Sequence, residues 1–166
     1  MPETKKVPKT AKMSFEEHII KSAISPYKKI MVGVDQPLVS AMILTRALEL
    51  AKTFSSKLYI VHVLGTKLPY NTTSKIAIEP EFYEVQWESS REMLEFAKRA
   101  AAEARIDAET VLLEGEPAEE ILSFIEEKGI NLVVMGSKDK VGSLKNLGSV
   151  SARVATEAKC SVLIER

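Results

Sequence analysis

The strongest constraint on the fold of this chain is a repeated alternation of two patterns. Short apolar runs rich in β-branched residues, such as "KIMVGV" from Lys29 and "LYIVHVL" at 58–64, are each followed by a longer segment with helical spacing. The runs are too short for helices and apolar at nearly every position, which is typical of strands buried on both faces. Because a helix is the usual crossover between parallel strands, the alternation predicts one α/β domain with a mostly parallel sheet.

The complete pattern predicts strands and helices in strict succession. Further strands are expected at "TVLL" from Thr110, "NLVVM" at 131–135 and "SVLIE" at 161–165. Helices are expected from Pro37 to about Phe54, from about Pro80 with Met93, Phe96, Ala97, Ala100 and Ala104 on one face, from Pro117 to Gly129, and from Gly148. Right-handed crossovers then place helices on both faces of the sheet.

A doubly wound sheet also predicts where a ligand binds. The expected place is the edge formed by the carboxyl ends of the strands, near the point where the winding direction reverses. The sequence puts 33–35, 63–64, 113–115 and 135–137 at these strand ends. These four short stretches are therefore the first candidates for a binding site.

Composition narrows the class of protein. Lys+Arg and Asp+Glu balance at 23 each, so we expect no nucleic-acid partner. No apolar stretch is long enough to span a bilayer, and the single Cys160 suits a reducing compartment, so we expect a cytoplasmic protein without a membrane contact. Residues 1–26 are expected to form a flexible extension with a short helix, whose start Ser14 and Glu17 can cap reciprocally.

The loop after the fourth strand, "GSKDKVGSLKNLGSVS" at 136–151, has two interpretations. The backbone N–H groups of Gly148, Ser149 and Val150 open a helix and can hold an anion such as a phosphate. Alternatively, Gly148 eases a tight turn and Ser149 caps the helix. Asp35 likewise either accepts a hydrogen bond from a ribose or belongs to a turn.

Nothing in the sequence favours catalysis. His62 lies inside an apolar strand and is interpreted as a core residue, and the chain lacks both the serine elbow of hydrolases and the Walker phosphate loop. Neither histidine stands where a serine nucleophile would need its base. We therefore expect a binding module that is not an enzyme.

Several segments together resemble the universal stress protein family. They are "YKKIMVGVD", "LYIVHV", "EGEPAEEIL" and "NLVVMGS…GSVSARVATEAKCSVLI", and the likeness covers 27–166. The resemblance implies five parallel strands in the order 3-2-1-4-5 with two helices on each face. It also implies a stress-response role and a homodimer formed through the last strand.

Members of the family that bind ATP carry the motif G-x2-G-x9-G-(S/T), which this chain matches in part. Gly136 matches the first glycine, and Gly148 with Ser149 matches the last pair, whereas Asp139 replaces the middle glycine and the interval to Gly148 is one residue short. By resemblance, ATP or AMP with magnesium would also contact Gly33, Asp35, Val63 and Met135. The alternative is a member that binds no nucleotide and acts as a dimeric interaction or scaffold module.

Overall fold

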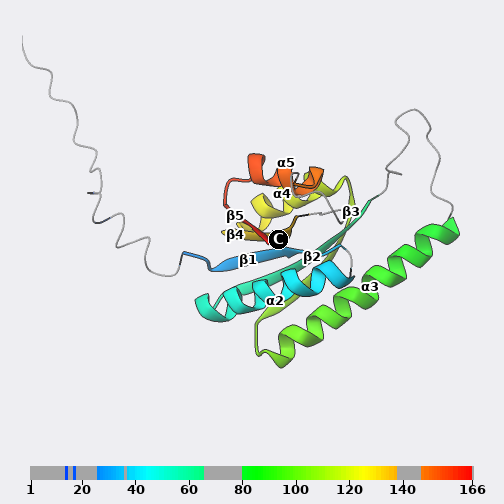
Figure 1. The fold of residues 1–166 in the computed structure, drawn as a ribbon, viewed down its shortest axis with the longest axis horizontal. Helices are drawn as coiled ribbons and strands as arrows, with labels where there is room; N and C mark the ends of the chain where they lie inside the picture. Colours follow the sequence, from blue (N-terminus) through cyan, green and yellow to red (C-terminus); the bar gives the residue numbers. More distant parts are fainter. Residues whose placement is uncertain are drawn as a thin grey trace, which may run out of the picture.

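The strands form one parallel sheet in the order β3-β2-β1-β4-β5 (Figure 1). This computed structural model describes residues 14, 17, 26–35, 37–65, 80–137 and 147–165. Its strands are β1 (Lys29–Gly33), β2 (Lys57–Gly65), β3 (Ala108–Gly115), β4 (Leu132–Gly136) and β5 (Ser161–Glu165). The predicted doubly wound α/β fold and its strand order are confirmed.

Two helices cover each face of the sheet. The described helices are α2 (Pro37–Phe54), α3 (Pro80–Glu103), α4 (Pro117–Lys128) and α5 (Ser149–Glu157). In Figure 1, α2 and α3 lie below the sheet and α4 and α5 above it. None of the helices in the described residues is both long and apolar enough to cross a bilayer. The winding direction reverses between β1 and β4, which are neighbours at the centre of the sheet.

Alternate residues of the central strands feed two separate cores. Ile30 and Val32 of β1 pack into the core beneath α2 and α3, while Met31 between them packs toward α4 and α5. All three side chains are fully buried. This alternation follows from the period of two along a strand, and burial on both faces explains why the run is apolar at nearly every position.

The prediction that Phe96 lies on the buried face of α3 is wrong, because its side chain is 61% exposed. The buried face consists of positions three and four residues apart, namely Ser90, Leu94, Ala97 and Ala101. Phe96 precedes Ala97 by one residue, a rotation of about 100° around the helix. Its side chain therefore points away from the sheet.

Both ends of α4 match the sequence prediction. The Glu116 carboxylate accepts a hydrogen bond from the N–H of Glu119 at 2.9 Å, which satisfies a donor of the first turn. Gly129 ends the helix with φ 63° and ψ 49°, a left-handed conformation that glycine adopts without strain. Local chemistry thus defines this helix from either side.

The expected capping pair near the chain start is also present. The N–H of Ser14 donates to the Glu17 carboxylate at 2.8 Å, and the N–H of Glu17 donates to the Ser14 hydroxyl at 3.1 Å. This is the reciprocal arrangement of a capping box. The rest of the predicted extension at 1–26, apart from these two residues and Pro26, lies outside the described residues.

Gly115 is a position where we expect alanine to destabilise the fold. It has φ 150°, which side chains rarely adopt, and a Cβ there would lie 2.5 Å from Glu120 Oε1. Glu120 can rotate away, but the backbone strain remains, so Gly115→Ala should lower the free energy of unfolding by about 1 to 3 kcal/mol. Urea denaturation measures the change.

The neighbouring glycine provides a matched control for this prediction. Gly65 pairs with Gly115 across β2 and β3, and a Cβ at Gly65 would meet nothing within 4 Å. Gly65→Ala should leave stability unchanged or raise it slightly, because alanine restricts the unfolded chain. Equal losses in the two variants would contradict the assignment of strain to Gly115.

Candidate functional site

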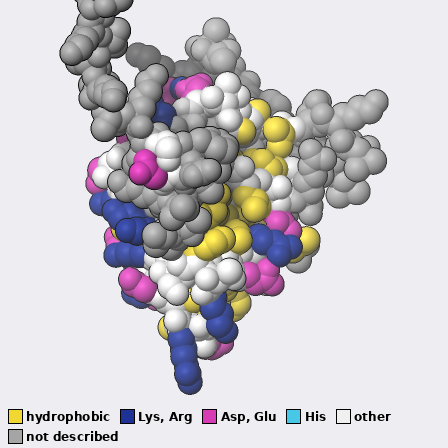
Figure 2. All heavy atoms as spheres, turned by 90° about the vertical axis from the view of Figure 1, so that its left-hand side faces the viewer, with side chains coloured by type: hydrophobic (Ala, Val, Ile, Leu, Met, Phe, Trp, Pro, Cys, Tyr) yellow, Lys and Arg dark blue, Asp and Glu magenta, His cyan; other side chains and the backbone are white. Residues whose placement is uncertain are grey.

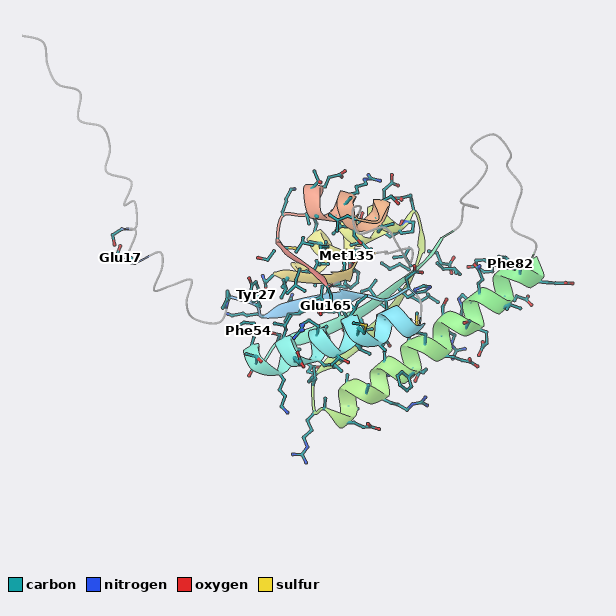
Figure 3. All side chains as sticks on the ribbon, in the orientation of Figure 1. Glu17, Tyr27, Phe54, Phe82, Met135 and Glu165 are labelled. Atoms are coloured by element: carbon teal, nitrogen blue, oxygen red, sulfur yellow. The ribbon has the colours of Figure 1, made fainter. Side chains whose placement is uncertain are left out.

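The carboxyl ends of β1 and β4 meet at the reversal point of the sheet. Val32 pairs with Val134, and a Cβ built on Gly33 would lie 3.8 Å from the Met135 side chain. Gly33 and Met135, two of the predicted site residues, are therefore adjacent. Met135, labelled in Figure 3, lies at the carboxyl end of β4, beside the reversal point where the topology predicts a ligand site.

The first turn of α5 is tied directly to the end of β4. The Ser151 hydroxyl donates to the Gly136 carbonyl at 2.8 Å, and the Ser151 side chain is buried. This bond brings Gly136, Gly148 and Ser149 to the same edge of the sheet. The structure thus gathers both ends of the partial motif, and the Ser151 hydroxyl donates its proton within the fold.

Glycine occupies the cap position of α5. Gly148 stands there with φ −56° and ψ 152°, and among the described residues no side-chain hydrogen bond caps the helix. Ser149 is the first residue of the helix itself and its side chain is exposed, so it is not the capping serine that one interpretation of the loop required. An uncapped helix start presents backbone N–H donors and a partial positive charge.

Removing the Ser151 hydroxyl should loosen the attachment of α5. Ser151→Ala leaves the Gly136 carbonyl without its partner, and such a loss at a buried site costs about 1 to 3 kcal/mol. Thermal or urea denaturation measures this loss. Ser149→Ala, on the same helix at an exposed position, is the control and should change stability by less than about 0.5 kcal/mol.

A second polar position follows β1. Asp35 has an exposed side chain, and its N–H donates to the buried Ser40 hydroxyl of α2 at 3.0 Å. Val63 of β2 is half-buried and pairs with Leu113 near the carboxyl end of β3. Asp35 and Val63 therefore lie at the same edge as Gly33, on the β1 and β2 side of the reversal point.

An arginine connects α5 to the start of α4. Arg153 Nη1 lies 3.2 Å from Glu116 Oε2, the same carboxylate oxygen that caps α4, while Arg153 Nε lies 3.1 Å from Glu157 Oε1. The hydrogen bond with Glu157, offset by partial desolvation and helped by the other carboxylates, raises the pKa of Arg153. These contacts help to keep α5 in position beside α4.

Tyr83 at the start of α3 interacts with the Glu114 carboxylate at the end of β3. This interaction with the carboxylate raises the pKa of Tyr83 above its ordinary value, since ionising the phenol would break it beside a negative charge. Phe82, the exposed neighbour of Tyr83, lies at the outer end of α3 (Figure 3). Glu114 thus has a partner within the fold.

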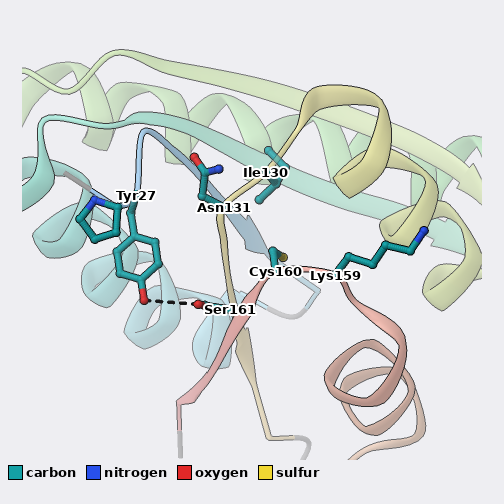
Figure 4. A pocket seen from close by; sticks show the side chains of 7 residues that line it. Tyr27, Ile130, Asn131, Lys159, Cys160 and Ser161 are labelled. Carbon is teal, nitrogen blue, oxygen red and sulfur yellow. Dashed lines mark hydrogen bonds between the residues drawn. The ribbon is translucent and has the colours of Figure 1, made fainter. Parts of the chain in front are cut away.

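A hollow of about 530 Å³ lies at the opposite edge of the sheet (Figure 4). Its lining comes from the amino ends of β1, β4 and β5, and the Tyr27 hydroxyl donates across it to the Ser161 hydroxyl at 3.3 Å. Cys160, also in the lining, packs against the core beneath α4 and α5, and burial raises the pKa of its thiol. Cys160 is therefore a packing residue in this structure. Ligands of parallel α/β sheets bind at the other edge.

Comparison with known proteins decides the family. A model of the universal stress protein family matches residues 26–166. The chain belongs to the universal stress protein family. The universal stress protein YxiE of Bacillus subtilis is 40% identical over 149 residues, a match that covers 84% of this chain and 99% of the relative.

Solved structures agree with this assignment of the universal stress protein fold. The universal stress protein UspA from Lactobacillus plantarum matches with a TM-score of 0.73 and 20% identity, over 84% of this chain and 98% of its own. A universal stress protein in complex with cAMP matches with a TM-score of 0.64 and 26% identity, over 86% of this chain and 99% of its own.

In this universal stress protein, most predicted site residues lie within one edge of the sheet. Gly33, Met135 and Gly136 lie at the reversal point, and the Ser151 bond brings Gly148 and the first two residues of α5, Ser149 and Val150, to the same edge. Asp35 and Val63 lie beside them. The altered middle of the motif, Asp139, and its flanking Lys138, Lys140, Gly142 and Lys145 lie outside the described residues. Sequence reasoning missed Ser40, which no motif marks, and it did not anticipate that Ser151 would bond to β4.

Proposed function

We propose that this protein binds an adenine nucleotide, ATP or AMP, at the carboxyl edge of its sheet. The observation that carries the proposal is the start of α5, which has glycine at its cap position and no side-chain cap from the described residues, held beside the reversal point by the Ser151 to Gly136 bond. Backbone N–H groups and the helix dipole favour a phosphate at such a position. Gly148 has no side chain to obstruct that approach.

The rest of the edge suits the nucleoside. Gly33 leaves the end of β1 open beside Met135, and the exposed Asp35 can accept a hydrogen bond from a ribose hydroxyl. The related universal stress protein that carries cAMP, itself an adenine nucleotide, supports the same ligand class. Val63 would contact the adenine edge through its backbone.

In this proposal, the bound nucleotide regulates the interactions of the protein with its partners. The protein would change its contacts with partner proteins according to its nucleotide state, and it would not act as an enzyme. Magnesium would accompany ATP through the phosphates. Among the described residues no group of three or more His, Cys, Asp or Glu side chains is placed to hold a metal ion.

Two measurements on the full chain test the proposal. Mass spectrometry of the denatured purified protein should detect carried ATP or AMP, and calorimetry should show binding of ATP with magnesium. Tripolyphosphate is the control ligand, since it can use α5 but not Asp35 or Val63, and should bind more weakly. The proposal fails if millimolar ATP and AMP produce neither heat nor a thermal shift.

The competing function is a nucleotide-free interaction module. Asp139 and the shortened loop favour it, because they alter the place where the family brings glycine backbone to phosphate. Nucleotide recovered from the purified protein would exclude this alternative. An enzymatic role would require a specific catalytic rate faster than slow ATP hydrolysis. The Asp35→Ala substitution would have to abolish that rate.

Dimerisation through β5 is part of the same proposal. β5 is an edge strand, and its Val162, Leu163 and Ile164 remain half-buried in the single chain. Figure 2 shows that hydrophobic side chains also gather on the face turned to the viewer, outside any labelled element. An unpaired apolar edge favours pairing with a second copy. Sedimentation velocity should give a dimer, and a monomer throughout the micromolar range would reject this part.

A cytoplasmic location completes the proposal. Cys160 is the only cysteine of the chain, so no internal disulfide is available to it. A nucleotide sensor also needs access to the cellular ATP pool. Fractionation of cells that produce the full chain, with immunodetection, should recover the protein with the cytoplasmic fraction, and recovery outside the cell would contradict this location.

A further inference from the structure

The peptide bond between Val34 and Asp35 is held on both sides by buried side chains. On one side, His62 Nδ1 lies 2.7 Å from the Val34 carbonyl oxygen. On the other, the N–H of Asp35 donates to the Ser40 hydroxyl at 3.0 Å. His62 is 7% exposed and Ser40 is 5% exposed, so water competes little for either bond.

These two contacts fix the direction in which Asp35 leaves the sheet. A peptide unit is planar, so holding its carbonyl and its N–H together fixes the rotation of the plane. The N–H of Val34 adds a third bond, to the Val61 carbonyl of β2 at 2.9 Å. The backbone just before Asp35 is therefore held by β2 and by α2 at once.

The contact between His62 and the Val34 carbonyl shows which imidazole nitrogen carries a proton. A carbonyl oxygen only accepts, so Nδ1 must carry the proton. His62 follows Val61 on β2 and so points to the opposite face, the α2 and α3 side, whereas Val61 packs toward α4 and α5. A phosphate at α5 would thus lie away from the imidazole, and His62 would act through the backbone.

We propose that His62 and Ser40 are positioning residues that set nucleotide affinity by orienting Asp35. This inference rests on the proposed nucleotide-binding function and deepens it. We call the two bonds from His62 and Ser40 to the Val34–Asp35 peptide the clamp. Without the clamp, this peptide can rotate, and Asp35 must then be ordered when the ligand binds. Loss of one well-aligned hydrogen bond to a charged group lowers affinity roughly 10- to 100-fold.

A double-mutant cycle on the full chain tests whether His62 acts through Asp35. His62→Leu removes the donor, while His62→Asn can place an amide N–H near the position of Nδ1. Calorimetry with ATP and magnesium should show a loss of about 10- to 100-fold for His62→Leu and a smaller loss for His62→Asn. In an Asp35→Ala background, His62→Leu should change affinity less than about twofold.

The same cycle contains the outcomes that overturn the inference. Equal losses with and without Asp35 would show that His62 supports the fold in general. No loss in the wild-type background would show that the clamp has no effect on binding. Ser40→Ala should behave like His62→Leu, whereas Thr45→Ala, an exposed hydroxyl on the same helix that bonds to the Ala41 carbonyl, should leave affinity unchanged.

A measurement without nucleotide separates this inference from the proposed function. Amide hydrogen exchange of Asp35, followed by NMR, should be faster in Ser40→Ala than in the wild type, with Thr45→Ala as the control. Unchanged exchange would overturn the clamp itself. If the wild type binds no nucleotide, both the proposed function and the predicted effect on affinity are wrong. The hydrogen-exchange result would still decide whether the clamp orders Asp35.

Discussion

Replacing Ser149 by aspartate should weaken nucleotide binding while making the folded protein slightly more stable. Ser149 is the first residue of α5 and its side chain is exposed. A carboxylate there interacts favourably with the helix dipole, worth about 0.3 to 1 kcal/mol. The same carboxylate repels a phosphate a few ångströms away by about 1 to 4 kcal/mol, which lowers affinity roughly 10- to 1000-fold.

Nucleotide affinity and folding stability should thus change in opposite directions in this variant. Most substitutions that weaken binding by disturbing a site also lower stability, so a stable protein with weaker binding identifies charge at the helix start as the cause. Calorimetry with ATP and magnesium measures the affinity, and thermal denaturation without nucleotide measures the stability. Raising the salt concentration should reduce both effects, because exposed charges are screened.

Ser149→Asn is the matched control, since it has nearly the shape of aspartate without the charge. It should retain most of the nucleotide affinity, within about fivefold of the wild type. Equal losses for the aspartate and asparagine variants would show that size at this position matters and not charge. Unchanged affinity in Ser149→Asp would place the phosphate away from α5 and contradict the proposed site.

Much of the fold could be predicted because its signals are local and periodic. Pro37, Glu116 and Gly129 mark helix ends by their own chemistry, and each stands where it was expected. Strand length was less predictable. β3 covers Ala108–Gly115, well beyond the apolar "TVLL", because Ala108 pairs with Leu58 and Gly115 with Gly65 of the longer β2. Pairing with β2 thus lengthens β3 beyond the residues that the apolar pattern marks.

The candidate site could be predicted from the sequence only in part. Topology alone places the ends of β1 and β4 together, so Gly33 and Met135 could be predicted from strand order. The bonds of Ser40 to Asp35 and of Ser151 to Gly136 could not, because each joins a side chain to a backbone group whose position depends on the packed tertiary structure. His62 was correctly predicted to be buried, but its bond to the Val34 carbonyl has no sequence signal.

Replacing Asp139 by glycine should tighten ATP binding roughly 10- to 1000-fold. Asp139 stands where the family motif has its middle glycine, although the residue lies outside the described part of the chain. The substitution removes a negative charge from the loop that leads to Gly148, and it restores the backbone freedom of glycine. Calorimetry of the full chain with ATP and magnesium measures the gain, and AMP should gain less because it carries fewer phosphate charges.

Asp139→Asn separates the two causes of that gain. Asparagine removes the charge but keeps a side chain, so it should recover the electrostatic part alone. If the two variants bind ATP equally tightly, charge is the whole penalty and the loop needs no glycine there. If only Asp139→Gly gains affinity, close approach of the backbone to phosphate is the decisive requirement. If neither gains, the shortened loop follows another path, and nucleotide binding would have to rest on α5 and the ends of β1 and β4.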